Sequence, residues 1–412
     1  MARGFAVTYR PLYFLSALGM GGLAISFFVY LMFLVPHPGE PIPNFSHIAA
    51  VYDGVGTLTK VLVAIDLALI AYFALRHVQL LVRNILAYRG FARSAEFAEF
   101  RQTNAEVSLL AIPLTYAMSV NVAFVLGALF VPGLWGVKEY LFPFALLAFA
   151  AIGAYAFGLF GRYLTRILTH RNFDIEDTNH FSQVLPSFAF AMIATGFAAS
   201  AAMSDTKTYV VIGLLGTFLF FAASVSWIAI KLPVSFGAML RHGMATEAGP
   251  TLWMGIPIFT LFGITILRDA SGIAHTLLHT TIPAIVWLVF FGLLVAAQVV
   301  MGLTGWAIMR RQSYFKDYIR GEKRSIAAYG LICPGVAVAV LAQFFIHWGL
   351  VSTNIVAKFS PIHLALLAVV AVVQIVTIAT VVRLNRKLLG RSTSAPGSLA
   401  RTGNDEPEAA CA

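Results

Sequence analysis

The sequence predicts an all-α polytopic membrane protein with ten transmembrane helices. Of its 412 residues, 59% are hydrophobic and only 11% are charged, and the mean hydropathy is +0.83. Soluble domains carry about 25% charged residues. A soluble protein of this length has too small an interior to hide so much apolar surface, so we expect lipid to cover much of it. A net charge of +10 would suggest nucleic-acid binding in a soluble chain. In a membrane protein, the location of the positive charges along the chain is more informative than their number. We therefore expect no nucleic-acid partner.

The first apolar segment is interpreted as a retained span. Its basic lead-in resembles a signal peptide, but residues 13–35 form an apolar run of 23 residues. That run is too long for a signal peptide, and no small-residue cleavage site follows it. Nine further segments are long and apolar enough to cross about 30 Å of hydrocarbon. They cover residues 58–80, 106–131, 139–164, 183–203, 208–231, 250–268, 280–308, 326–350 and 361–384.

Lysine and arginine are distributed unevenly between the two sets of loops. With the N-terminus inside, 23 of the 28 Lys and Arg residues fall on the cytoplasmic side. Cytoplasmic loops of membrane proteins are enriched in these residues. The distribution therefore predicts an even number of spans, with both termini in the cytoplasm.

Two segments outside the spans lie on this cytoplasmic side. Residues 84–105 carry three phenylalanines among Arg and Glu residues, which is typical of a connector helix lying at the membrane interface. Residues 391–412 are small and polar, which predicts a disordered tail. Residues 1–390 are expected to form one transmembrane domain.

Prolines recur at a regular spacing in alternate spans. The third, fifth, seventh and ninth spans each contain one, and the separations are 73, 71 and 77 residues. In the first span, Gly19 and Gly22 are the matching helix-weakening residues. Proline and glycine are common in membrane helices, but a near-constant spacing confined to alternate spans favours a structural repeat. The prolines are Pro113, Pro186, Pro257 and Pro334.

The repeat predicts five helical hairpins. Five kinked inner helices would surround a central pore, and five straighter outer helices would brace them. A proline kink leaves a carbonyl without its partner and exposes a half-helix N-terminus with positive partial charge. Non-helical backbone at membrane depth is tolerated only where protein or a watery cavity covers it. The arrangement therefore favours a path for anions.

Four short stretches resemble a known family of anion channels. They are "LLAIPLTYAM", "HFSQVLPSFAF", "WMGIPIFTL" and "AAYGLICPGVAVAVLAQFF". Each is similar to an odd-numbered helix, from the third to the ninth, of the tellurite-resistance TehA and plant slow-anion-channel family, which includes malate permeases and sulfite exporters. The likeness covers roughly residues 10–385. It implies a homotrimer in which each protomer has its own pore for small anions, with no catalytic chemistry and no cofactor.

The resemblance also identifies a gate position at which this sequence differs. In the family, a phenylalanine just before the proline of the ninth helix blocks the pore, and here Cys333 takes that place. Either the pore is wider there, or another bulky residue closes it, or the thiol contacts the solute. Cys333 as a small core residue that only packs is an equally weighted interpretation. The candidate replacements, all just past odd-span prolines, are Phe188, Phe190, Phe259 and Tyr116.

Three further polar side chains lie within the spans. Placing an ionisable acid at the depth of Asp66 in the membrane costs several kcal/mol, so such a residue is by default a candidate functional residue. It could carry a proton together with Asn121, or form a structural pair with Lys60. The structural role is favoured, because the second span is an outer helix in the resembled family. Asn121 and Gln343 are expected to join helices, and Gln343 is also placed to line the path.

The sequence therefore predicts a channel or transporter for small anions in a bacterial inner membrane, gated near the kink of the ninth helix. One alternative is a proton-coupled carrier of a weak acid or sulfur oxyanion that uses Asp66. Another is the membrane anchor of a quinone-reactive redox complex, which would need facing histidines deep in the helices. The ten histidines lie mainly in loops or at span ends, and His275 and His279 have no evident third metal ligand. No enzyme motif is present, so we expect no enzyme, cofactor or metal.

Overall fold

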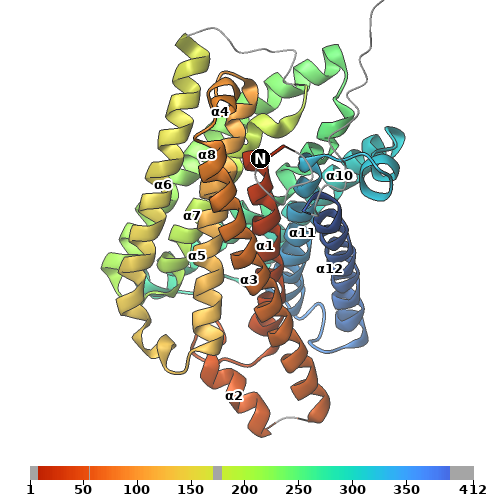
Figure 1. Ribbon diagram of the computed structural model, residues 1–412. Helices are drawn as coiled ribbons and strands as arrows, with labels where there is room; N and C mark the ends of the chain where they lie inside the picture. Colours follow the sequence, from red (N-terminus) through yellow and green to blue (C-terminus); the bar gives the residue numbers. More distant parts are fainter. Residues whose placement is uncertain (1–7, 55, 170–178, 390–412) are drawn as a thin grey trace, which may run out of the picture.

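The computed structural model describes residues 8–54, 56–169 and 179–389, so the predicted disordered tail lies outside the described residues. The described residues form helices and connecting turns, with no strand among them (Figure 1). The α-helices are α1 (Phe14–Leu34), α2 (Phe45–Gly54), α3 (Thr57–Phe91), α4 (Ala95–Phe100), α5 (Ala111–Phe130), α6 (Lys138–Thr169), α7 (Leu185–Met203), α8 (Lys207–His242), α9 (Gly255–Gly272), α10 (Ala284–Arg311), α11 (Ile332–Phe344) and α12 (Pro361–Leu388).

Shorter helices of other types precede or extend these α-helices. The 3₁₀ helices are η1 (Pro11–Tyr13), η2 (Asn104–Leu110), η3 (Leu134–Val137), η5 (Phe181–Val184), η6 (Thr246–Trp253) and η9 (Ile326–Leu331). The π-helices are η7 (Ile273–Leu277), η8 (Phe315–Arg320) and η10 (Phe345–Val351). Within the described part of the chain, ten helical segments are long and apolar enough to cross a membrane. This confirms the ten expected spans and supports an integral membrane protein.

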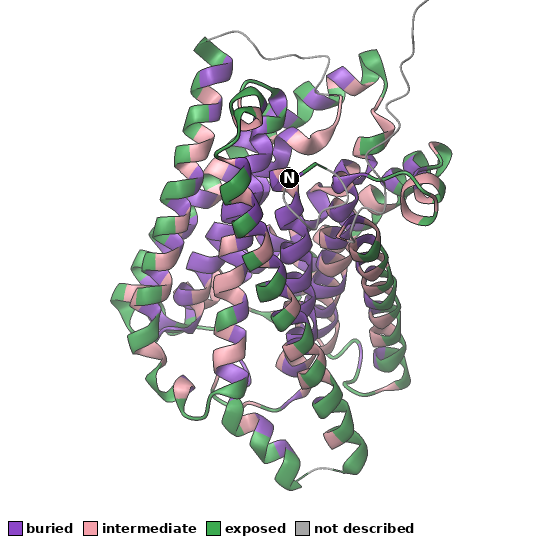
Figure 2. Ribbon diagram, in the orientation of Figure 1, coloured by how far each residue is buried: buried purple, intermediate pink, exposed green. Residues whose placement is uncertain are grey.

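The ten spans alternate between more and less buried helices. In the most apolar stretch of the first, third, fifth, seventh and ninth spans, between 56% and 94% of residues are buried. In the other five spans the share is between 17% and 33%. Figure 2 shows the same division, with buried residues concentrated in the middle of the bundle and exposed residues on its outside. The more buried spans are α1, α5, α7, α9 and α11 with the short helices that adjoin them.

Each buried helix contacts the next one along this series. Helix α1 packs against α5, α5 against α7, α7 against α9, α9 against α11, and α11 again against α1. Each also packs against the less buried span that follows it, in the pairs α1–α3, α5–α6, α7–α8, α9–α10 and α11–α12. The five buried helices are therefore neighbours in chain order and return to the first.

Each buried span begins as a 3₁₀ helix and then becomes α-helical. Pro186 is the second residue of α7, and Pro113, Pro257 and Pro334 are the third residues of α5, α9 and α11. The structure therefore corrects the prediction of proline interruptions within these helices and places the prolines in the first α-helical turn. The physical reason is that first-turn N–H groups have no acceptor within their own α-helix, so proline removes no hydrogen bond there.

The predicted free N-termini of half-helices are also replaced by continuous hydrogen bonding. The N–H of Ile332, at the start of α11, donates to the carbonyl of Tyr329 in η9. The N–H of Leu185, at the start of α7, donates to the carbonyl of Ser182 in η5. Because the 3₁₀ segments supply these acceptors, the helix starts contribute less exposed positive charge than the sequence suggested.

Gly19 and Gly22 permit close packing of α1 on α11. Helix α1 continues through both glycines without a break. A Cβ added at Gly19 would lie 2.7 Å from Ile332 Cγ2, and one added at Gly22 would lie 3.1 Å from Val336 Cγ1. Small residues of this kind allow membrane helices to approach closely. Their effect here is contact between two buried helices rather than a kink.

The segment 84–105, expected to be an interfacial connector, is divided. Its first part continues α3 to Phe91, and the short helix α4 follows. The rings of Phe91, Phe97 and Phe100 contact one another, and the guanidinium of Arg10 lies 5.5 Å from the centre of the Phe91 ring. Phe91 and Phe100 are buried. These rings therefore fasten the segment to the N-terminal part of the protein.

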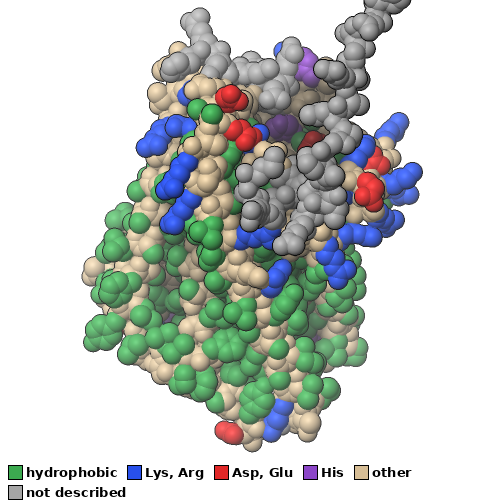
Figure 3. Space-filling view, viewed as in Figure 1, with side chains coloured by type: hydrophobic (Ala, Val, Ile, Leu, Met, Phe, Trp, Pro, Cys, Tyr) green, Lys and Arg blue, Asp and Glu red, His purple; other side chains and the backbone are tan. Residues whose placement is uncertain are grey.

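Charged and apolar side chains separate along the height of the bundle. We call the end at which α1 begins, uppermost in Figure 1, the N-terminal end of the bundle. Figure 3 shows Lys and Arg side chains mainly toward this end, with hydrophobic side chains covering much of the height below it. The short helix α2, which the sequence did not suggest, lies at the opposite end (Figure 1).

Candidate functional site

All five buried spans line one cavity inside the bundle. Its volume is about 150 Å³, and α6 and the loop residue Ile42 add to its wall. Most of the lining side chains are Leu, Ile, Val, Met and Phe, and no Asp or Glu is among the described residues that line it. The polar lining residues are Asn121, Thr195, Ser200, Thr260, Arg268 and Cys333.

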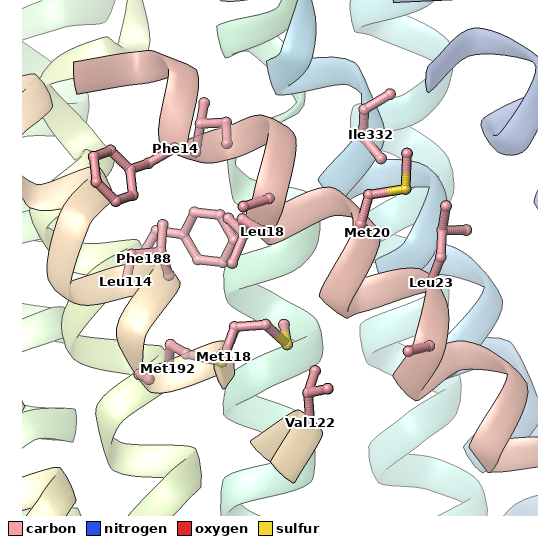
Figure 4. Close-up of a cluster of buried hydrophobic side chains, with 14 of the residues drawn as sticks. Phe14, Leu18, Met20, Leu23, Leu114, Met118, Val122, Phe188, Met192 and Ile332 are labelled. Carbon is pink, nitrogen blue, oxygen red and sulfur yellow. The ribbon is translucent and has the colours of Figure 1, made fainter. Parts of the chain in front are cut away.

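The first residues of three buried α-helices bring side chains to the N-terminal part of the cavity. Cys333 is the second residue of α11, and it lines the cavity together with Leu18 of α1 and Phe188 of α7. Figure 4 shows Leu18 and Phe188 in one cluster with Met118 of α5 and Met192 of α7. Phe188 is 4% exposed. Phe188 is therefore a large, buried aromatic side chain in the same cavity wall as Cys333.

Cys333 and Pro334 face different surroundings although they are adjacent. Cys333 is half-buried and lines the cavity. Pro334 instead lines a separate groove between α10 and α12 on the outside of the bundle. Helix α11 therefore separates the cavity from this outer groove at the level of its first turn.

The other aromatic candidates lie away from the cavity. Phe190 is fully buried between α6 and α8, where its ring contacts those of Phe157, Phe160 and Phe220. Two residues separate Phe190 from Phe188, and an α-helix turns about 200° over two residues, so the two rings point to opposite sides of α7.

Phe259 and Tyr116 are also outside the cavity wall. Phe259 is half-buried and does not line the cavity. Tyr116 is half-buried, and its ring packs edge-on against Phe14 with ring centres 6.2 Å apart. The structure therefore retains Phe188 alone among the four aromatic candidates as a lining residue.

Arg268 is a cavity residue that the sequence analysis did not select. It lies near the end of α9, four residues before Gly272, and lines the cavity. Its Nη1 donates a hydrogen bond to the carbonyl of Thr195 on α7 at 2.9 Å. No carboxylate of the described chain forms a salt bridge with it. The expected seventh span, residues 250–268, ends at Arg268, but the observed span continues beyond it to Leu277.

Asn121 and Gln343 make contacts that join helices. Asn121 lines the cavity, and its amide donates to the carbonyl of Ala117 and contacts the sulfur of Met192 on α7. Gln343 is fully buried outside the cavity wall, and its amide donates to the carbonyl of Ser26 on α1 at 3.4 Å. Of its two suggested roles, the contacts favour the one that connects helices.

Asp66 is remote from the cavity wall. It is half-buried on α3, and its Oδ2 is buried without a hydrogen-bond partner. No salt bridge with Lys60 is present in the described part of the chain. Neither of the two suggested partners, Asn121 and Lys60, therefore holds this carboxyl group.

Two histidines meet at the end of the bundle opposite the N-terminal end. His347 and His363 are buried, and their Nε2 atoms lie 3.2 Å apart. The backbone N–H of Phe359 donates to His363 Nδ1 at 3.2 Å, and His347 Nδ1 lies 2.8 Å from the carbonyl of Gln343. These contacts suit two neutral rings, each donating once and accepting once. Direct contact leaves no space for a haem iron between them.

His77 is a further buried histidine within a span. Its Nδ1 lies 2.8 Å from the carbonyl of Ala17, and its Nε2 lies 2.9 Å from Ser119 Oγ. It joins α3 to α1 and α5. These three histidines lie near the ends of the expected spans, as the sequence indicated, and they are buried. Each has protein partners within hydrogen-bond distance.

Comparison of the chain with family models, with curated proteins and with solved structures finds no match. The functional interpretation therefore depends on the geometry of the cavity and on the residues that line it.

Proposed function

We propose that the protein passes small anions across a bilayer through the cavity enclosed by its five buried helices. The observation that carries this proposal is Arg268, the one charged side chain among the described residues that line the cavity. Its guanidinium donates to the carbonyl of Thr195 and forms no salt bridge in the described chain, although the neighbouring Asp269 interacts with it electrostatically.

Arg268 is half-buried, and Asp269 compensates for its charge without a direct salt bridge. A cation removed from water in this way is unfavourable unless further groups compensate for its lost hydration. An arginine side chain has five N–H donors, of which the Thr195 contact uses one. A small anion entering the cavity would accept from the remaining donors and offset part of the desolvation cost. The absence of acidic side chains from the described wall removes the repulsion that an anion would otherwise meet.

The arrangement of the helices supports a path along the bundle. We propose that the five buried helices and their partners form five hairpin repeats around this path, as in the TehA and slow-anion-channel family that the sequence resembles. Leu18, Phe188 and Cys333 would narrow the path at the N-terminal end, which we assign to the cytoplasm of a bacterial cell. A homotrimer with one path per protomer is part of the same proposal.

Anion flux into liposomes tests the role of Arg268. Wild-type protein is expected to admit small anions such as chloride, nitrate or formate, and Arg268→Gln is expected to lower the flux about tenfold or more. A hydrogen bond to a charged group contributes about 1.5–3 kcal/mol, and 1.4 kcal/mol corresponds to a factor of ten. Arg268→Lys keeps the charge and should retain part of the flux.

Arg241→Gln is the matched control, because Arg241 is exposed near the end of α8. This variant should conduct like wild type. Equal flux through wild type and Arg268→Gln would contradict the proposal. Flux that requires a proton gradient and is lost in Asp66→Asn would instead favour the proton-coupled carrier.

A further inference from the structure

A second concave feature lies on the outside of the bundle, between α10 and α12. It has a volume of about 1020 Å³, and its floor is formed by the N-terminal half of α11. Both α10 and α12 belong to the less buried spans, with 17% and 28% of their apolar stretches buried. The groove therefore opens toward the surroundings of the protein and not toward the cavity.

Most of the groove wall is apolar. Val338 of α11 forms part of the floor, and Val372, Val376 and Ala379 of α12 form one side. Trp306 of α10 forms the other side. A Cβ added at Gly335 would lie 2.0 Å from Thr377 Oγ1, so α11 and α12 are in close contact under the groove. The depression is therefore shaped by helix packing and suits a hydrocarbon chain.

Four basic side chains border the same groove near the N-terminal end of the bundle, and no Asp or Glu is among its described lining residues. They come from the last turn of α10, from η8 and from α12. Figure 3 shows Lys and Arg side chains together at the right-hand side, where this part of the chain lies. The four residues are Arg310, Lys316, Arg320 and Arg383.

Local contacts hold these charges over the groove. Lys387 on α12 donates to the carbonyls of Tyr318 and Gly321 at 2.8 and 2.7 Å, which fastens η8 to α12. The acid within η8, Asp317, is engaged by Lys323 at 2.7 Å. The guanidinium of Arg310 lies 5.0 Å from the centre of the Trp306 ring. The segment that carries Lys316 and Arg320 is therefore fastened to α12, and Arg310 lies against Trp306 in the groove wall.

We propose that this groove binds an anionic phospholipid. The phosphate would lie among the four basic side chains, and one acyl chain would lie along α11 between α10 and α12. Basic pockets between membrane helices on the cytoplasmic side recognise anionic head groups, and each Lys or Arg near such a surface contributes about 1 kcal/mol. Charge alone would also suit soluble phosphate, but the apolar wall that continues beneath the charges selects a lipid.

The position of the groove connects lipid binding to the helix that lines the cavity. Pro334 and Gly335 form part of the groove floor, and Cys333 faces the cavity on the other side of α11. A bound acyl chain would therefore support the first turn of α11 from outside.

Native mass spectrometry of the purified full-length protein tests the proposal. Phosphatidylglycerol and phosphatidylcholine with identical acyl chains are titrated separately, and glycerol 3-phosphate serves as the head group without chains. Wild type is expected to bind phosphatidylglycerol about tenfold more tightly than phosphatidylcholine, and to bind glycerol 3-phosphate much more weakly than either lipid. Replacing Arg310, Lys316, Arg320 and Arg383 together by Gln should reduce the preference to about twofold or less.

A matched variant removes the same number of charges elsewhere. Arg89, Arg93, Arg162 and Arg241 are exposed and do not line the groove. Their combined replacement by Gln should leave the preference unchanged. Ala379→Trp keeps every charge but fills the groove, and should weaken binding of both lipids.

Three results would overturn the proposal. The first is equal loss of preference in the two charge variants, which would show only a general attraction. The second is undiminished lipid binding in Ala379→Trp. The third is a change in oligomer mass without a change in lipid binding in the groove variant, which would assign the groove to a second copy of the chain.

Discussion

Two residues differ in how far the sequence could reveal them, although both line the cavity. Cys333 was selected by its position before Pro334 and by the family gate, and the structure places it in the cavity wall. Arg268 was not selected, because it is the last residue of the expected span 250–268 and the apolar run weakens around "RDASG". Its exposure to the cavity depends on the packing of α7 against α9, and a linear pattern of hydropathy contains no information about such packing.

Aromatic candidates illustrate the same limit at the scale of single side chains. Phe188 and Phe190 are two residues apart and share the same local sequence context. One lines the cavity, and the other packs against Phe157, Phe160 and Phe220. Both sides of α7 are apolar because this helix is buried all round. Helical periodicity separates the two rings but does not say which of them faces the interior.

A larger side chain at Cys333 should close the path. We expect Cys333→Phe to reduce anion flux into liposomes about tenfold or more, because the ring would occupy part of a cavity of only about 150 Å³. Cys333→Ala should conduct at least as well as wild type, because it removes a side-chain atom without adding volume.

Val300→Phe is the control for the added ring, because Val300 is exposed on α10. It should leave the flux unchanged. Full conduction by Cys333→Phe, in protein that remains folded, would show that the path avoids the first turn of α11.

The sequence predicted the helices well and their internal changes poorly. Each of the ten expected segments overlaps one observed span, because the length of an apolar run directly reflects membrane thickness. The 3₁₀ segments that begin the buried spans left no comparable signal. They depend on tertiary contacts and on the proline in the first α-helical turn, so the regular proline spacing identified the right helices but suggested the wrong kind of irregularity.

Close approach between helices predicts which glycines tolerate substitution. A Cβ at Gly272 would lie 2.2 Å from the carbonyl oxygen of Ala201, a backbone atom that cannot rotate away. Gly272→Ala should therefore separate α9 from α7 and destabilise the protein by about 1–3 kcal/mol, the usual cost of overpacking. The loss is measured as a lower midpoint of thermal unfolding, followed by size-exclusion chromatography of the heated protein.

Gly158→Ala gives the opposite expectation at an open position. Nothing lies within 4 Å of a Cβ at Gly158, which is exposed on α6. The variant should be as stable as wild type or more stable by about 0.5–1 kcal/mol, because alanine favours a helix interior more than glycine does. Equal unfolding midpoints for the two variants would argue against the close α7–α9 contact.

At the scale of the whole molecule, two sequence properties specify most of the architecture. Apolar length gives the number of spans, and the uneven placement of Lys and Arg gives the end of the bundle at which charge collects (Figure 3). The sequence does not give the order in which the buried helices meet, because α1 and α11 pack together although most of the chain separates them. That closure, and the cavity it creates, arises only from packing.

The orientation of the bundle in the membrane follows from the same charge distribution and can be tested with the native cysteines. In a Cys333→Ala background, Cys411 is the one remaining cysteine. Cytoplasmic loops are enriched in Lys and Arg, so we expect a membrane-impermeant maleimide to label Cys411 in inside-out vesicles and not in right-side-out vesicles.

A cysteine introduced by Gly136→Cys, with Cys411 replaced by Ser, should show the reverse pattern. Gly136 is exposed between α5 and α6 at the opposite end of the bundle, and a Cβ there meets nothing within 4 Å. Labelling of both cysteines from the same side would contradict an odd number of crossings between Gly136 and Cys411. Labelling of Cys411 from outside alone would invert the proposed orientation. In that second case the lipid groove and the narrow end of the cavity would face the exterior, and both would need a different physiological partner.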